Sequence, residues 1–167
     1  MSPEARLLAR VQRVAPSLLE CGAFVSGAAA AHVHLAAATR SAADGTVGYV
    51  ALVPGSVQVV CPDGAAERLA SIGLECDSSR VALVVRRRLD LFATIAQWVD
   101  GTRVPVLSRD ALLAQLLAQG GLAIGLAGLV VRLCRRPRLD PDVVREILKA
   151  AGQPDRFQPL HELLAVA

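Results

Sequence analysis

Apolar residues recur at helical spacing along much of this chain, most clearly from Arg103 to Gln119. The pattern there is typical of a short strand that leads into a helix. Ser108 can accept hydrogen bonds from the first amide groups of that helix, and Asp110 places a negative charge where the helix dipole favours it. The leucines that follow form one broad apolar face: Leu112, Leu113, Leu116 and Leu117. We therefore expect this element to anchor a helical C-terminal half.

The same periodicity predicts further helices near both ends of the chain. Ser2-Pro3 is a favourable helix start, and Asp140-Pro141 is another. Ser26 is the expected N-cap of a helix made almost wholly of alanine. The predicted helices cover residues 3–19, 27–38, 65–72, 108–119, 122–134, 141–151 and 158–165.

Between these helices the chain is richer in β-branched residues and turn pairs. Runs at 49–53 and 56–61 flank the turn pair Pro54-Gly55, and each predicts a strand. The segment 80–86 predicts another strand, because its interior is continuously apolar, as in a strand that is covered on both sides.

The segment 90–99 fits either a helix or a strand. The pair Asp100-Gly101 favours a hairpin in which residues 96–99 pair with residues 102–106. Strands enclosed by helices at both ends indicate an α+β fold.

We expect one domain over residues 1–167. It would have a helical N-terminal segment at 1–38, a small and mostly antiparallel sheet within 46–106, and a helical C-terminal part at 108–167.

The longest uncharged stretch, 111–131, is long enough to cross a bilayer and contains a GxxxG spacing at 121–125. Two observations favour a globular fold instead. Gln115 and Gln119 lie inside the stretch, and Gly120-Gly121 within a helix would cost about 2 kcal/mol relative to two alanines. We therefore predict two buried helices that meet at this glycine pair, and no membrane association.

The composition restricts the core and the charge-driven functions. Hydrophobic residues make up 53% of the chain but aromatic residues only 3%, so the core must consist of Leu, Val and Ala. The net charge of +3 is small for a nucleic-acid-binding protein. The four cysteines show no CxxC spacing, and Glu4 with Arg6 and Arg10 interrupts the first apolar residues, unlike a signal peptide. We expect a cytoplasmic protein with reduced thiols.

Two groups of arginines are candidate contacts for phosphate, nucleic acid or an acidic partner, and they fit a solvated surface equally well. One group lies on the polar face of the first predicted helix, and the other ends the predicted strand at 80–86. The candidates are Arg6, Arg10, Arg13, Arg86, Arg87 and Arg88. The single tryptophan, Trp98, is a candidate partner-interface residue or a core residue.

The sequence carries no constellation that predicts catalysis. A nucleotidyl-transfer site combines a Gly-Ser turn at a helix start with two acids one residue apart that hold Mg²⁺. Ser26-Gly27 precedes a predicted helix and Asp44 follows it, but residues 46–53 contain no acid. His32 and His34 point to different faces of one helix, so they cannot share a metal there. We expect no catalytic residue, no metal and no cofactor.

Three stretches resemble a known family. Residues 99–113 are Val-Asp-Gly-Thr-Arg-Val-Pro-Val-Leu-Ser-Arg-Asp-Ala-Leu-Leu, residues 139–147 are Leu-Asp-Pro-Asp-Val-Val-Arg-Glu-Ile, and residues 161–164 are His-Glu-Leu-Leu. These stretches resemble the C-terminal domain of AbiEi-type antitoxins, which belong to bacterial abortive-infection toxin–antitoxin pairs. Val25-Ser26 and the helix that follows resemble the segment before that family's first strands.

This resemblance implies a non-catalytic regulatory domain that interacts with a protein partner, such as a nucleotidyltransferase-like toxin. The family's DNA-binding winged helix has no room in residues 1–20, so the implied protein is an antitoxin domain without it. Two alternatives stay open, namely an inactive protein of nucleotidyltransferase fold and a nucleic-acid-binding module that uses the arginine groups. Self-association is the alternative to a different protein partner.

Overall fold

The computed structural model describes residues 2–39, 52–97 and 101–165, and a five-stranded sheet lies at its centre. The strands are β1 (Phe24–Val25), β2 (Gln58–Val60), β3 (Glu75–Cys76), β4 (Ala93–Gln97) and β5 (Arg103–Leu107). Their order across the sheet is β3-β2-β1-β5-β4.

The sheet is mixed, so the prediction of a mostly antiparallel sheet is wrong, while the α+β class is confirmed. β1 pairs antiparallel with β2 and parallel with β5, and β4 pairs antiparallel with β5. β2 and β3 are parallel because a short helix connects them as a crossover rather than as a hairpin. Neither β1 nor β3 was predicted, because each is only two residues long and has no periodicity of its own.

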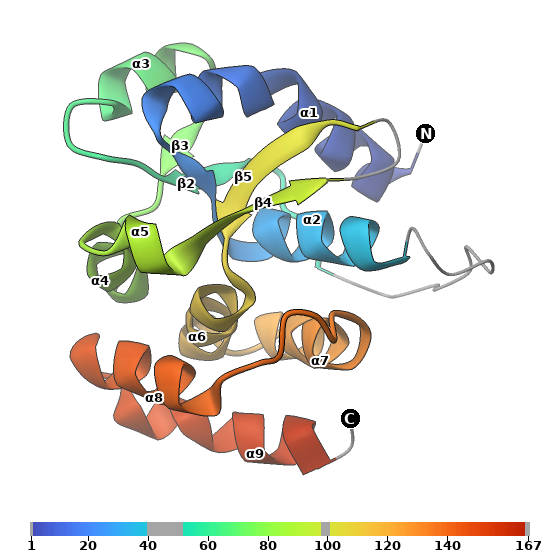
Figure 1. Cartoon of the computed structure of the whole chain (residues 1–167), viewed down its shortest axis with the longest axis vertical. Coiled ribbons are helices and arrows are strands. Elements are labelled where there is room, and N and C mark those ends of the chain that lie inside the picture. The colour runs from blue at the N-terminus through green and yellow to red at the C-terminus, as the bar shows by residue number, and fades with distance from the viewer. Residues whose placement is uncertain (1, 40–51, 98–100, 166–167) are drawn as a thin grey trace.

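Helices lie on both faces of the sheet and continue as a stack at the C-terminal end. They are α1 (Pro3–Cys21), α2 (Gly27–Thr39), α3 (Ala66–Ser71), α4 (Arg80–Arg86), α5 (Leu89–Phe92), α6 (Arg109–Gln119), α7 (Ala123–Leu133), α8 (Pro141–Ala150), the 3-10 helix η1 (Pro154–Phe157) and α9 (Gln158–Ala165). Figure 1 shows α1 and α3 above the sheet, α2 below it, and α6 to α9 stacked beneath α2. The chain therefore builds successive layers on one side of the sheet.

The predicted helix starts at both ends of the chain are confirmed. The Ser2 hydroxyl accepts a hydrogen bond from the Ala5 amide at 3.1 Å, and the Asp140 carboxylate accepts one from the Asp142 amide at 3.0 Å. Each cap precedes a proline at the first helical position, where a missing N–H costs nothing. The local sequence thus fixes where α1 and α8 begin.

The uncharged stretch forms two helices, α6 and α7, of 11 residues each, as predicted. They meet at Gly120 and Gly121, whose φ angles of 69° and 57° lie in the left-handed region that favours glycine. Eleven residues of helix span roughly 16 Å, about half the hydrocarbon thickness of a bilayer. Among the residues that the structure describes, no helix combines the length and the apolarity needed to cross a membrane.

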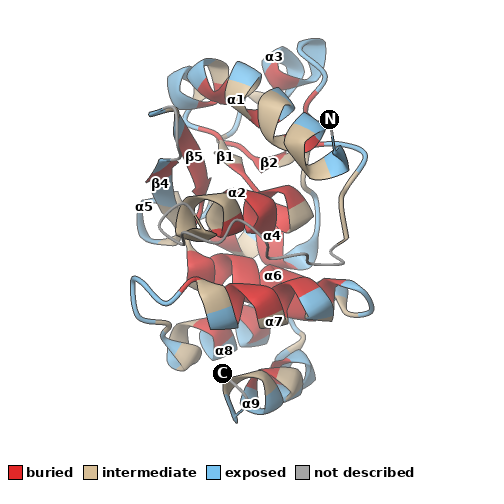
Figure 2. Ribbon diagram, turned by 90° about the vertical axis from the view of Figure 1, so that its right-hand side faces the viewer, coloured by how far each residue is buried: buried red, intermediate tan, exposed pale blue. Residues whose placement is uncertain are grey.

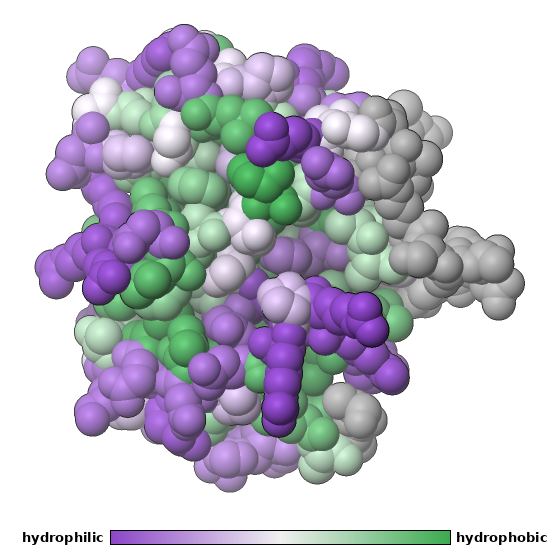
Figure 3. Space-filling view, in the orientation of Figure 1, coloured by the Kyte–Doolittle hydropathy of each residue, from purple (hydrophilic) through white to green (hydrophobic). Residues whose placement is uncertain are grey.

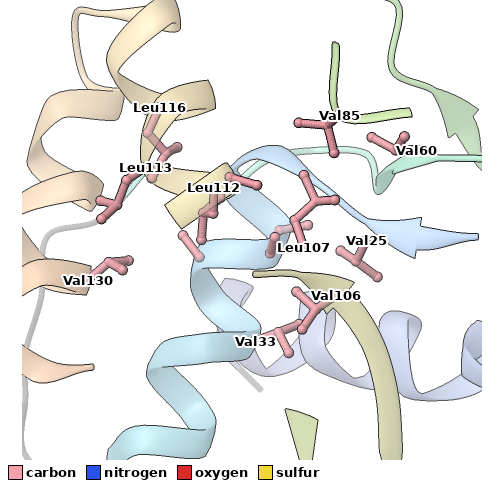
Figure 4. Packing of buried hydrophobic residues seen from close by; sticks show 14 of the residues in the cluster. Val25, Val33, Val60, Val85, Val106, Leu107, Leu112, Leu113, Leu116 and Val130 are labelled. Atoms are coloured by element: carbon pink, nitrogen blue, oxygen red, sulfur yellow. The ribbon is translucent and has the colours of Figure 1, made fainter. Parts of the chain in front are cut away.

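The core runs from the sheet through α2 and α6 to α7. Figure 4 shows Val33 of α2 beside Val106 of β5, with Leu112 and Leu113 of α6 extending the cluster toward Val130 of α7. All five side chains have no measurable exposure. In Figure 2 the buried residues fill the middle layers, and exposed residues lie mainly on the outer helices and on the loops. The predicted anchoring helix, α6, therefore lies at the centre of the helical half.

Residues 80–86, predicted as a strand, form the helix α4. The Ser79 hydroxyl accepts a hydrogen bond from the Ala82 amide at 3.2 Å and caps this helix. Val81 and Val85 are buried, but Leu83 is 49% exposed, which is the one-sided burial of a helix. A continuous apolar run does not distinguish a strand from a short helix, and here the cap and the packing on α6 and α8 decide the outcome.

The predicted hairpin is confirmed where the structure describes it. Ala96 pairs with Val104 and Gln97 with Arg103, and the strand extends back to Ala93. Of the predicted strand at 49–53 only residues 52 and 53 are described, and they lie outside any strand. Trp98 lies outside the described residues.

Candidate functional site

The turn between β1 and α2 lies at the middle of the sheet and contains the Ser26-Gly27 pair. Both residues are buried, and Gly27 has a φ of 63°, a conformation that side chains disfavour. A Ser-Gly turn that opens a helix presents amide groups and the positive end of the helix dipole to an anion. This is the Ser-Gly pair that the sequence offers as a candidate phosphate-binding turn.

The chain's own side chains occupy the hydrogen-bonding groups of this turn. The Gly27 amide donates to Oε1 of Gln115 at 2.6 Å, and the Ser26 hydroxyl donates to Oδ2 of Asp77 at 3.2 Å. The Nε2 group of Gln115 donates to the same Asp77 oxygen. The other oxygen of Asp77 accepts from the Ser79 amide at 2.9 Å. Ser26 was predicted to cap α2 with its side chain, but its hydroxyl instead bonds Asp77, because that carboxylate lies beside the turn.

In this network, side chains of the protein itself bond the amide and hydroxyl groups at the start of α2. The Asp77 carboxylate supplies the negative charge that a helix N-terminus attracts, and Gln115 is 5% exposed. A phosphate at the same place would have to displace Gln115 from the Gly27 amide and would lie against a carboxylate of like charge. The arrangement therefore disfavours an anion at this turn.

A cavity of about 510 Å³ opens beside the turn. Glu75, the first residue of β3, and Asp77, which follows that strand, both line it, and one residue separates them. This pair was not predicted from the sequence, because the acids of a nucleotidyl-transfer site were expected on the strand after the helix at 27–38, where residues 46–53 contain no acid. Three hydrogen bonds occupy the oxygens of Asp77, and no group of three or more metal-binding side chains gathers in the described residues.

Two cysteines that are scattered in sequence meet at the β2–β3 edge. The sulfur atoms of Cys61 and Cys76 lie 2.8 Å apart. Burial, followed by the hydrogen bond to Cys76, raises the pKa of Cys61 to about 11. Cys61 is therefore a thiol at neutral pH and a poor nucleophile. No spacing in the sequence pointed to this pair, because α3 separates its members.

A second group of polar residues lies under the α7–α8 connection. Arg109 is 5% exposed, donates to the Pro137 carbonyl, and has an Nε group with no hydrogen-bond partner in the described structure. Burial lowers the pKa of Arg109, and burial likewise lowers the pKa of His34, whose Nε2 lies 2.7 Å from the Leu107 carbonyl. His34 is therefore a neutral ring that donates to a backbone carbonyl.

His32 also bonds the backbone, with Nε2 at 2.8 Å from the Leu52 carbonyl. The two histidines of α2 contact different segments, as their spacing predicted.

The arginines predicted as anion contacts lie on the surface but do not form one patch. Arg6, Arg10 and Arg13 are exposed along α1, and Arg10 donates to the Gly55 carbonyl at 2.9 Å. The second group lies where α4 passes into α5, away from α1 (Figure 1).

Two of the arginines in that second group have carboxylate partners. Arg86 forms an ion pair with Asp63, and Arg88 lies 3.4 Å from Asp90. Arg87 is exposed between them. These neighbouring carboxylates reduce the positive charge that the group offers to an anion.

No protein-family model, curated protein or solved structure matches this chain.

Proposed function

We propose that this chain is a non-catalytic interaction protein that binds another protein. The observation that carries the proposal is the Ser26-Gly27 turn, which Gln115 and Asp77 fill from within. Nucleotidyl transfer needs such a turn free for phosphate, and here its amide and hydroxyl groups already have partners. The resemblance to an antitoxin domain supports the same class of function, with a nucleotidyltransferase-like toxin as the candidate partner.

Exposed apolar side chains support a protein partner. Leu83 on α4, Leu91 on α5 and Ile95 on β4 are 49%, 57% and 38% exposed, and these elements follow one another along the chain. A protein partner that covers these elements would remove this apolar surface from water. An inactive protein of nucleotidyltransferase fold is the alternative proposal, and it is compatible with the interaction role, because one fold can host unrelated functions.

The catalytic alternative is tested by incubating the purified chain with Mg²⁺ and each radiolabelled nucleoside triphosphate. We expect neither saturable binding nor transfer of nucleotide to protein or RNA. Transfer that the Asp77→Asn variant abolishes and the Asp90→Asn variant retains would overturn the proposal, because Asp77 lies at the turn and Asp90 on the surface.

The interaction role is tested by reciprocal purification from the native host. We expect one protein to copurify at fixed stoichiometry whether the tag is on this chain or on that protein. A chain that purifies alone in both directions, at native expression levels, would contradict the interaction role.

A further inference from the structure

A groove of about 470 Å³ lies between α2, β4 and the end of α7. Among the residues that the structure describes, its lining is apolar with a basic rim and contains no carboxylate. Ala37 and Ala38 of α2, Ile95 of β4 and Leu133 of α7 contribute apolar surface, and Arg135 and Arg136 lie at the rim. In Figure 3 hydrophilic side chains gather over the α7–α8 connection, just below a band that contains hydrophobic residues over β4.

The groove runs along the open edge of the sheet. β4 is the last strand in the order and pairs with β5 alone among the described strands. Side chains of a strand alternate between its two faces, yet Thr94, Ile95 and Ala96 all line the groove. A surface lined by three consecutive strand residues must follow the backbone edge.

The register of the hairpin shows which backbone groups this edge offers. Ile95 pairs with Pro105, which has no N–H, so this pair is of the non-hydrogen-bonded type. Hydrogen-bonded and non-hydrogen-bonded pairs alternate along an antiparallel ladder. The Ser108 amide donates to the Phe92 carbonyl at 2.7 Å, so the pair that these two residues form is hydrogen-bonded and the pair three positions further along, Ile95 with Pro105, is not. The N–H and C=O of Ile95 therefore point away from β5, toward the groove.

Positive charge borders this edge on the α7 side. Arg135 and Arg136 are exposed, and neither forms an ion pair with a carboxylate in the described part of the chain. Arg135 donates from Nε to the Arg132 carbonyl at 3.3 Å, which leaves its other N–H groups free to bind an anion. Arg109 adds a buried guanidinium directly behind Pro137.

We propose that an extended acidic segment of the protein partner adds to the β4 edge as a further strand. Its backbone pairs with the outward groups of Ile95, and its carboxylates bind Arg135 and Arg136. Apolar side chains that alternate with the acids contact the alanines of α2. This inference rests on the proposed interaction role and specifies the chemistry of the partner.

Two other occupants fit the groove less well. A second copy paired through β4 would present the same basic rim and would supply no carboxylate from its described groove to Arg135 and Arg136. A nucleic acid would satisfy the arginines but would leave the backbone edge of β4 unpaired. An acidic strand satisfies both features at once.

The test uses a fluorescent peptide in which glutamate and valine alternate, long enough to pair with all five residues of β4. Its anisotropy is measured with the full chain at low salt, up to about 1 mM protein. We expect saturable binding, and no binding by a peptide in which lysine replaces glutamate.

Substitutions at the basic rim and at the strand edge test the two halves of the contact, each with a matched control. Arg135→Glu combined with Arg136→Glu should weaken binding at least tenfold, whereas Arg6→Glu combined with Arg13→Glu, of equal charge change, should alter it less than twofold. Ile95→Pro removes the outward N–H and should weaken binding at least tenfold, whereas Ile95→Val should not. If Ile95→Pro fails to fold, N-methylation of alternate peptide residues makes the same test on the unaltered protein.

Binding that is insensitive to both Ile95→Pro and N-methylation would overturn strand addition and leave a simple charge contact. Equal binding of a single-stranded oligonucleotide, with the same response to all variants, would also overturn the proposal. Absence of peptide binding would reject this surface, whereas the proposed interaction role is decided separately by the nucleotide and reciprocal-purification experiments.

Discussion

At the scale of single residues, Gln115 connects two distant parts of the chain. Its side chain joins the Gly27 amide at the start of α2 to the Asp77 carboxylate beyond β3. A buried polar side chain that is hydrogen-bonded at both ends holds its neighbours in one arrangement. When one of these bonds is lost, the buried group left without a partner destabilises the fold. The sequence presented Gln115 only as a polar interruption in an apolar helix, because its partners lie 88 and 38 positions away.

Replacing Gln115 with leucine should lower the free energy of unfolding by roughly 2 kcal/mol or more. The change leaves the Gly27 amide without a partner and removes a donor from Asp77, and unsatisfied buried groups carry that order of cost. Urea unfolding followed by circular dichroism measures the loss. Gln119→Leu, one turn later on α6 and exposed, is the matched control. An equal loss in both variants would argue against the network.

His34 should make the fold sensitive to mild acid. Burial lowers its pKa below 6.5 in the folded state, so its contribution to stability is present above pH 6.5. As the pH falls below that value the unfolded chain takes up a proton that the folded chain resists, and stability declines by at most about 1.4 kcal/mol per pH unit.

The His34→Gln variant keeps a donor for the Leu107 carbonyl and should lose part of this decline between pH 7 and pH 5. The exposed His161→Gln variant serves as the control. Unchanged pH dependence in His34→Gln, measured by urea unfolding at each pH, would contradict the assignment of a neutral, half-buried ring.

At the scale of elements, the sequence predicted helices better than strands. Caps and periodicity located α1, α2, α6, α7, α8 and α9, because these signals are local. The two-residue strands β1 and β3 carry no periodicity of their own and exist because neighbouring strands pair with them. The segment 80–86 was misassigned because a continuous apolar run fits either type of element.

The cap of α4 offers a direct test of that reassignment. Ser79→Ala should lower the free energy of unfolding by about 1 kcal/mol, because the Ala82 amide loses its partner. Ser78→Ala is the matched control, since Ser78 is an exposed neighbour that precedes the cap. If α4 were a strand, the two substitutions would have similar and small effects on thermal unfolding.

At the scale of the whole molecule, the predicted fold class holds and the predicted site residues lie apart. The arginines of α1 and of α4 stand on separate surfaces, and two of the latter have carboxylate partners. The features that could carry function, the filled turn and the groove at β4, each combine residues from several elements. Such sites form only when distant segments meet, so spacing within one segment could not reveal them.

The claim that Gln115 and Asp77 fill the Ser26-Gly27 turn is tested most directly by NMR. The isotope-labelled chain is titrated with Mg²⁺ and nucleoside triphosphate, and the backbone amide of Gly27 is followed. The Gly27 amide donates to Gln115 at 2.6 Å, so we predict that its resonance stays unchanged to millimolar nucleotide. A saturable shift of that resonance would contradict the account, because it would mean that the turn opens to bind phosphate.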